Sequence, residues 1–219
     1  MFNSKLAGSI GLTETEKQFL REDSTPGEFQ KRLVRDFPYD FEEDGVEHFG
    51  SFRFALRKGQ AHCFTGAMLG AAYIYLNDLG PPLVLRIEAR DMAHHLAVFW
   101  RDGKIGSLGS SRHAELTGKP PLFTSYRDLV MSYYPDYYND VTNDPSDLTM
   151  RGFGGPVDLS IFGPGWLVSE DSLTGIVEYF DRLPQIKLFP GKPDMYAEFR
   201  KQGDFYFLTS ITYSMLQSR

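Results

Sequence analysis

The sequence predicts an α+β fold, and three patterns support this class. Helix-start and helix-stop signals recur in the N-terminal third, a longer apolar helical pattern begins at Cys63, and strand patterns follow over residues 83–108. With 219 residues, 42% of them hydrophobic, the chain can bury one substantial core. We expect a single domain over 1–219. Its core, at about 50–112, would be a central helix packed on an antiparallel sheet, with helical N-terminal additions and a helical, loop-rich extension at about 120–219.

Capping signals predict two helices near the N-terminus. Thr13 and Glu16 have the spacing of a capping box, in which the hydroxyl and the carboxylate each accept a backbone N–H. Thr25 and Glu28 repeat this spacing, with Pro26 at the first helical position. The apolar face expected on this second helix, before Pro38 stops it, consists of Phe29, Leu33, Val34 and Phe37.

The next segment leads into the central helix. Residues 39–48 are acidic and lack an apolar period, so we expect a loop, and Ser51 then starts a short helix that ends at Gly59. The helix from Cys63 should extend to Leu79, before Gly80-Pro81-Pro82. Its small residues predict close packing against a sheet, and they are Gly66, Ala67, Gly70 and Ala71.

Three strands are expected after this helix. Leu83–Ala89 is rich in branched apolar residues, His94–Trp100 is nearly all apolar, and Asp102-Gly103 is a strong hairpin turn signal that leads into Lys104–Leu108. We therefore predict an antiparallel sheet that packs on the Cys63 helix.

The C-terminal half carries weaker signals. Thr124 or Ser125 can cap a helix, and a tyrosine cluster follows at 133–138 that is core, rim or binding surface. Residues 139–165 are dense in Asp, Asn, Gly and Pro, which predicts mostly loop. A final helix should run from about Glu170 to Phe180, capped by Ser169.

Charge and composition exclude several classes of partner. The net charge of −6 is spread along the chain without a Lys/Arg block, so no nucleic-acid partner is expected. No apolar run approaches the roughly 18 residues of a membrane span, and the N-terminus lacks the pattern of a secretory leader. One cysteine cannot form an intrachain disulfide, which suits a reducing compartment. We expect a cytoplasmic protein without a cofactor.

The candidate chemistry lies in Cys63, His94 and His95. A thiol at a helix N-terminus feels the positive end of the helix dipole, and a nearby imidazolium further favours the thiolate. Backbone N–H groups of the first turn can hold an oxyanion. The opposing interpretation is that Cys63 is a small buried hydrophobe. Zinc is a further alternative, with ligands among His62, Cys63, His94, His95 and His113, but their spacing matches no recognised finger, and His62 and His113 are expected to be solvated loop residues.

This region resembles the papain-like and transglutaminase-like superfamily of cysteine enzymes, which includes the arylamine N-acetyltransferases. Cys63–Leu69 is similar to the helix that carries the nucleophile, and the hairpin through His94–Phe99 and Asp102-Gly103 is similar to the strands that carry the histidine and an Asp or Asn. The resemblance covers about 59–111 and is closest to uncharacterised bacterial transglutaminase-like proteins. The lead-in from Arg57 to His62 departs from the Arg-Gly-Gly of the acetyltransferases, which argues against that activity.

Strand parity places His94 on one face with Leu96 and Val98, and His95 on the other face with Ala97 and Phe99, so we expect only one of them to face Cys63. The number of residues from His94 to the Asp102-Gly103 turn is similar to that between the histidine and the turn in the acetyltransferases. The resemblance therefore favours His94 as the base. The other imidazole would be a supporting or surface group.

The third catalytic position departs from the family pattern. The Asp implied by the resemblance falls near Gly109, and residues 105–111 contain no carboxylate or amide. Ser107, on the same strand face as Gly109, is one candidate to orient the imidazole; Asp102 occupies the turn. The site is therefore a Cys-His dyad, a site completed by a carboxylate from elsewhere, or a degenerate site.

The resulting expectation is a cysteine-dependent hydrolase or acyltransferase for a peptide or small-molecule amide or ester. Cys63 would form an acyl-thioester, with His94 as general base. The alternative is a catalytically degenerate member of the fold that binds a protein partner through its aromatic surface at 133–138.

Overall fold

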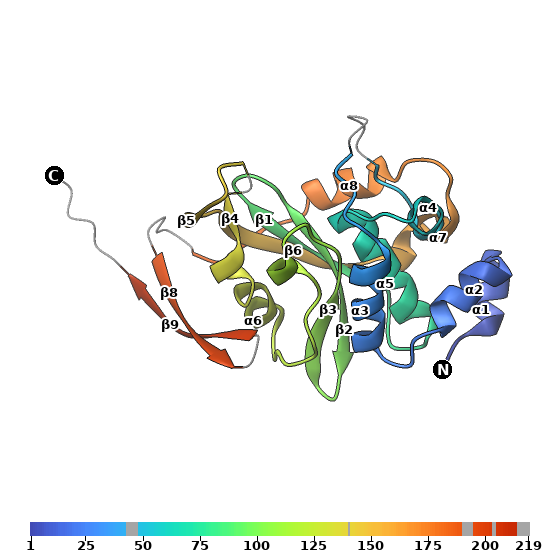
Figure 1. Cartoon of the computed structure of the whole chain (residues 1–219), viewed down its shortest axis with the longest axis horizontal. Helices are drawn as coiled ribbons and strands as arrows, with labels where there is room; N and C mark the ends of the chain where they lie inside the picture. Colours follow the sequence, from blue (N-terminus) through green and yellow to red (C-terminus); the bar gives the residue numbers. More distant parts are fainter. Residues whose placement is uncertain (43–47, 140, 190–194, 203–204, 214–219) are drawn as a thin grey trace.

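A five-stranded antiparallel sheet divides the helices of the protein into two groups, as Figure 1 shows. The computed structural model describes residues 1–42, 48–139, 141–189, 195–202 and 205–213, the last two ranges as backbone only. The strand order is β3-β2-β1-β6-β7, and every neighbouring pair is antiparallel. The predicted α+β class, with a helix packed on an antiparallel sheet, is confirmed.

The helices are α1 (Ser4–Ile10), α2 (Glu14–Arg21), α3 (Pro26–Asp36), α4 (Phe52–Lys58), α5 (Cys63–Leu76), α6 (Tyr126–Met131), α7 (Gly165–Val168) and α8 (Thr174–Asp181). Short 3-10 turns are η1 (Ala114–Leu116), η2 (Tyr134–Asp136) and η3 (Leu159–Phe162). The sheet strands are β1 (Leu83–Ala89), β2 (His94–Arg101), β3 (Lys104–Leu108), β6 (Met150–Asp158) and β7 (Ile186–Lys187). Two separate pairs are β4 (Tyr138–Asn139) with β5 (Asp144–Leu148), and β8 (Met195–Gln202) with β9 (Phe205–Tyr213).

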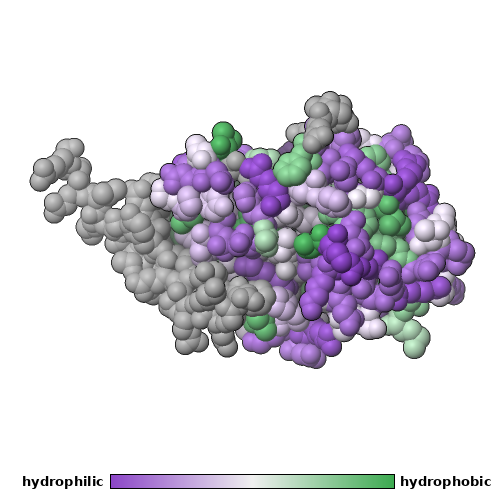
Figure 2. All heavy atoms as spheres, in the orientation of Figure 1, coloured by the Kyte–Doolittle hydropathy of each residue, from purple (hydrophilic) through white to green (hydrophobic). Residues whose placement is uncertain are grey.

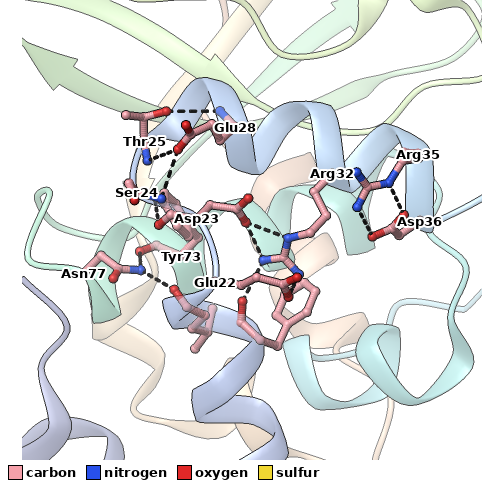
Figure 3. Close-up of polar contacts among 12 residues, drawn as sticks. Glu22, Asp23, Ser24, Thr25, Glu28, Arg32, Arg35, Asp36, Tyr73 and Asn77 are labelled. Carbon is pink, nitrogen blue, oxygen red and sulfur yellow. Dashed lines mark hydrogen bonds and ion pairs between the residues drawn. The ribbon is translucent and has the colours of Figure 1, made fainter.

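Both predicted capping boxes are present. The hydroxyls of Thr13 and Thr25 accept the N–H groups of Glu16 and Glu28, whose carboxylates accept the threonine N–H groups in return. Figure 3 shows the second of these boxes at the start of α3. Phe29, Leu33 and Phe37 are buried as expected, but Val34 is 51% exposed, because the buried face of α3 passes through Arg32 instead.

A buried arginine joins the N-terminal helices to the central one. Arg32 of α3 donates to the Asp23 carboxylate and to the Phe19 carbonyl, and its guanidinium lies 4.0 Å from the centre of the Phe19 ring. Tyr73 of α5 donates its hydroxyl to the Asp23 carbonyl (Figure 3). The α2–α3 connection is thereby fixed on the surface of α5.

The small residues of α5 allow the close approach to the sheet that the sequence predicts. A Cβ atom at Gly70 would lie 2.8 Å from the Leu108 Cβ and 3.0 Å from the Ala97 Cβ. The helix ends at Leu76 rather than near Leu79, because Asn77 caps it and Asp78 turns the chain with a φ of 53°. In the described ranges no helix combines the length and the apolar character that a bilayer crossing needs.

The strand β6 corrects the expectation of a loop over 139–165. It pairs with both β1 and β7 and so lies inside the sheet. The sequence did not predict this strand because its glycines interrupt the alternation of apolar and polar side chains that indicates a strand. The structure uses them for close approach, because a Cβ atom at Gly152 would lie 2.8 Å from the Ile186 carbonyl oxygen of β7.

The last predicted helix begins later than expected, at Thr174 instead of about Glu170. Ser169 does not cap it: its hydroxyl accepts the Asp171 N–H and donates to the Asp171 carbonyl, which makes a turn before the helix. The sequence pattern also missed α1, α7 and the β8–β9 pair.

Each face of the sheet covers a hydrophobic cluster. The larger cluster joins α5 to the N-terminal helices and to α7 and α8, and contacts the sheet through Val84, Ala97 and Leu108. The smaller one lies on the opposite face and joins α6 and η2 to Leu85, Leu96 and Val98. Figure 2 shows a mostly hydrophilic surface on the visible face, with apolar residues in small scattered groups.

Candidate active site

His62 caps the helix that carries the thiol. Its Nδ1 accepts the N–H of Phe64 at 3.2 Å, and its Nε2 lies 2.9 Å from the His48 carbonyl oxygen. Because a carbonyl only accepts, Nε2 carries a proton, and Nδ1 is the acceptor that caps the helix. The expectation of a solvated loop residue is wrong, since His62 is buried.

Cys63 follows as the first residue of α5 and is half-buried. Its Sγ lies 4.0 Å from Nδ1 of His95 and 3.9 Å from the carbonyl oxygen of Ala93. The structure thus brings the helix N-terminus against the start of β2, where the sequence places the histidine pair.

The two histidines lie on opposite faces of β2, as parity requires. His95 lies on the α5 face, where its ring contacts the rings of Phe64 and Phe180 at centroid distances of 5.4 and 5.2 Å. His94 lies on the other face and donates from Nε2 to the Leu116 carbonyl at 2.8 Å. Neither is a surface group, because His94 is 5% and His95 is 6% exposed.

The surroundings of the thiol favour its ionised form. Burial raises the pKa of Cys63, but its interactions with the three flanking imidazoles outweigh burial and hold the pKa well below its ordinary value. The histidines that contribute are His62, His94 and His95.

A pocket opens onto this thiol. It is small and open to solvent, with a cavity volume of roughly 50 Å³, and its lining includes Cys63 and His94 but not His95. The lining also contains aromatic and charged side chains, among them Tyr39, Asp91, Arg112, Tyr137 and Tyr138. A molecule in this pocket would contact Cys63 and His94 directly. His95 does not line the pocket and contacts the thiol side chain from the α5 face of the sheet.

The position of the missing third residue is occupied by backbone contacts. Gly109 gives its N–H to Oε1 of Gln30 and accepts from Nε2 of the same side chain, both at 2.9 Å. The Ser107 hydroxyl bonds to Tyr133 at 2.8 Å and accepts the Lys119 N–H at 2.9 Å. Neither contact reaches an imidazole. Asp102 lies in the β2–β3 turn with a φ of 51°.

Sequence reasoning missed two groups of this site. The Leu116 carbonyl orients His94. A backbone acceptor in a 3-10 turn cannot be predicted from the sequence, because every residue type carries a carbonyl. His62 had a signal that could have been used, since it directly precedes the helix at the N-cap position, with Thr65 three residues on.

The tyrosine cluster is mostly interior. Tyr133, Tyr134 and Tyr137 are buried, and Tyr138 is half-buried at the pocket. Among the residues that the structure describes, no group of three or more His, Cys, Asp or Glu side chains is arranged to hold a metal ion.

No protein-family model and no curated protein sequence matches this chain. The assignment of chemistry therefore rests on the geometry of Cys63 and its histidines.

Proposed function

We propose that this protein is a cysteine-dependent hydrolase or acyltransferase of the transglutaminase-like type, acting on a peptide or small-molecule amide or ester. One observation carries the proposal: a half-buried thiol at a helix N-terminus touches an imidazole, has two more beside it, and opens into a pocket. The single cysteine also suits a reducing, cytoplasmic setting.

The reaction begins with the thiolate. Sγ of Cys63 attacks the substrate carbonyl, and a tetrahedral oxyanion forms beside the first turn of α5, where the Cys63 N–H belongs to the groups a helix leaves without an internal partner. The carbon–nitrogen or carbon–oxygen bond then breaks, and the leaving group takes a proton from an imidazole. Water or an amine attacks the acyl-thioester, the carbon–sulfur bond breaks, and the imidazole recovers a proton.

In this proposal His94 and His95 have different roles in proton transfer. The sequence pattern favours His94 as the base, whereas the 4.0 Å contact favours His95 for accepting the thiol proton. His94 lines the pocket, and with its Nε2–H donated to Leu116 its Nδ1 is the free acceptor. We assign Nδ1 of His95 to accepting the thiol proton, which then passes to Nδ1 of His94 through one bound water. The resulting His94 imidazolium gives this proton to the leaving group, and the same nitrogen then takes a proton from the incoming nucleophile.

The alternative of a protein-binding module keeps its best support, the missing third catalytic residue, but loses much of the surface assigned to it. The aromatic surface expected to bind the partner lies at residues 133–138, and three tyrosines of that segment are buried. The perturbed thiol has no role in that alternative.

The rate of iodoacetamide labelling against pH tests the proposal, and it reports on Cys63 alone because the chain has one cysteine. The wild-type protein should label rapidly below pH 7, because its pKa lies below the ordinary value. His95→Ala should move the midpoint toward about 8.5 and slow labelling at pH 6.5 roughly tenfold. His94→Ala should change labelling less, but should abolish turnover of an activated ester.

Three other outcomes would contradict parts of the proposal. A plain midpoint near about 8.5 in all three proteins would reject an activated thiol. Labelling only in denaturant would show a structural, buried cysteine. If His94→Ala shifted the profile and His95→Ala did not, the thiol base would be His94.

A further inference from the structure

The imidazole that touches the thiol has an unpaired nitrogen on its other side. Nε2 of His95 is buried and has no hydrogen-bond partner among the described residues. If Nδ1 is to accept the thiol proton, Nε2 must carry the ring proton of the neutral form. A buried N–H without an acceptor is unfavourable, so the proposed chemistry requires an acceptor there.

A second unpaired polar atom lies on the neighbouring strand segment. Oγ of Ser110 is also buried without a partner among the described residues, and Ser110 is 4% exposed. The β2–β3 ladder pairs Ala97 with Leu108. Two further steps of this antiparallel register bring residue 110 opposite His95, on the same face of the sheet.

Ser110 also faces the helix that carries the nucleophile. A Cβ atom built on Gly66 would lie 2.8 Å from Ser110 Oγ, and Gly66 is one helical turn after Cys63. The hydroxyl is therefore located between the first turns of α5 and the start of β2, which is the layer that contains the His95 ring.

Two other polar side chains on the neighbouring strands do not supply the acceptor. Arg86 lies opposite His95 on β1, but a guanidinium has no acceptor, and it pairs with Asp181 at 2.6 Å and Glu88 at 3.1 Å. Ser107 faces away from α5 and bonds to Tyr133 and Lys119.

We propose that Ser110 is the third member of the site: its hydroxyl accepts the Nε2 proton of His95 through one bound water and fixes the tautomer that leaves Nδ1 to the thiol. Ser110 is a positioning residue, since it acts through His95. This inference rests on the proposed function and gives the site a serine where the family resemblance implies an Asp or Asn.

The test compares Ser110→Ala with Ser107→Ala, a matched loss of a buried hydroxyl from the opposite sheet face. Ser110→Ala should slow iodoacetamide labelling of Cys63 at pH 6.5 roughly three- to tenfold, because a rise of up to one pKa unit lowers the thiolate fraction by up to that factor. Labelling at pH 9.5 should be unchanged. Ser107→Ala should keep the wild-type pH profile even if its melting temperature falls.

The outcomes separate this inference from the proposed function. If wild-type labelling is fast and depends on His95 while Ser110→Ala matches the wild type, the role of Ser110 is rejected and the enzyme proposal stands. A plain wild-type profile rejects both. If Ser110→Ala does not fold, ¹⁵N shifts of the His95 ring in the unmodified protein decide, at a pH where the ring is neutral. The Nε2–H form supports the inference, and the Nδ1–H form overturns it.

Discussion

At the scale of single residues, three imidazoles meet one thiol, but they are not equivalent. Protonation of Nδ1 of His62 would turn a donor toward the Phe64 N–H and break the helix cap. In the proposed reaction, the moving proton is therefore assigned to His94 and His95, whose Nδ1 atoms do not cap a helix. The N-cap histidine His62 holds the start of α5 in place.

A buried carboxylate outside the site gives a prediction for stability against pH. Glu16 accepts from Arg53 at 2.6 Å and from the Thr13 N–H at 2.7 Å. Burial raises the pKa of Glu16, but these contacts outweigh it and lower the pKa overall. A carboxyl with a lowered folded-state pKa stabilises the fold above its unfolded value of about 4.3, and this stabilisation is lost as the pH falls through the folded-state pKa.

Glu16→Gln should therefore lower the free energy of unfolding by about 2 kcal/mol at pH 7, measured by urea denaturation. The difference from the wild type should shrink steadily below pH 4 as the native carboxylate is protonated. Glu14→Gln is the control, because Glu14 is exposed and pairs only with Lys17 at the helix surface, and it should leave stability unchanged. An equal loss for Glu16→Gln at pH 7 and pH 3 would show that charge has no part in this contact.

The sequence predicted the thiol and the two histidines of the candidate site, but not the groups that contact these histidines. Cys63, His94 and His95 could be found because a thiol at a helix start and a histidine pair at a strand start are visible in the sequence pattern. Leu116 and Ser110 could not, since one contributes only a carbonyl and the other depends on the register of two strands. Both become visible only when the chain is folded.

At the scale of elements, α5 controls the distance between the thiol and the sheet. It has almost no polar face, and its small residues lie where the sheet comes closest. The nucleophile and its histidines are on separate elements, so their separation follows from how deeply this helix packs. A side chain inserted between α5 and the sheet must change that separation.

Gly70→Ala should therefore destabilise the protein although alanine is the better helix former. The added Cβ would lie 2.8 Å from Leu108 and 3.0 Å from Ala97, and such overpacking costs about 1–3 kcal/mol, against a helix gain of about 1 kcal/mol. We expect a lower melting temperature and slower labelling of Cys63 at pH 6.5, as its distance to His95 grows.

Gly8→Ala is the matched substitution with the opposite sign. Gly8 lies in α1, and an added Cβ there would have no atom within 4 Å. Only the helix propensity changes, so the protein should gain up to about 1 kcal/mol. If both variants lost or gained stability equally, close helix–sheet packing at Gly70 would be disproved.

The strands show where element prediction stops. Asp102-Gly103 and the branched apolar runs predicted β1 to β3 with their bounds almost unchanged. β6 was missed although it lies between β1 and β7, because glycines allow backbone contact where side chains would signal a strand. Strands are predicted from alternating side chains, and the three glycines of β6 interrupt that alternation.

At the scale of the whole molecule, distant parts of the chain meet at the site. The N-terminal helix α3 contacts α5 through Phe29 and Tyr73, whose rings stack with centroids 4.2 Å apart. The same helix holds the end of the β2–β3 hairpin, because Gln30 bonds both backbone groups of Gly109. Gly109 directly precedes Ser110, so α3 supports the segment that we propose positions His95.

Gln30→Ala should loosen that segment while the fold persists. Removal of the amide leaves the Gly109 N–H and carbonyl without their partners, which costs about 1–2 kcal/mol and should raise the hydrogen-exchange rate of the Gly109 amide roughly tenfold. Labelling of Cys63 at pH 6.5 should slow with it, since Ser110 is less well held. Gln18→Ala, on the exposed face of α2, should change neither quantity. Faster exchange with unchanged labelling would show that the α3 contact stabilises the hairpin without reaching the thiol.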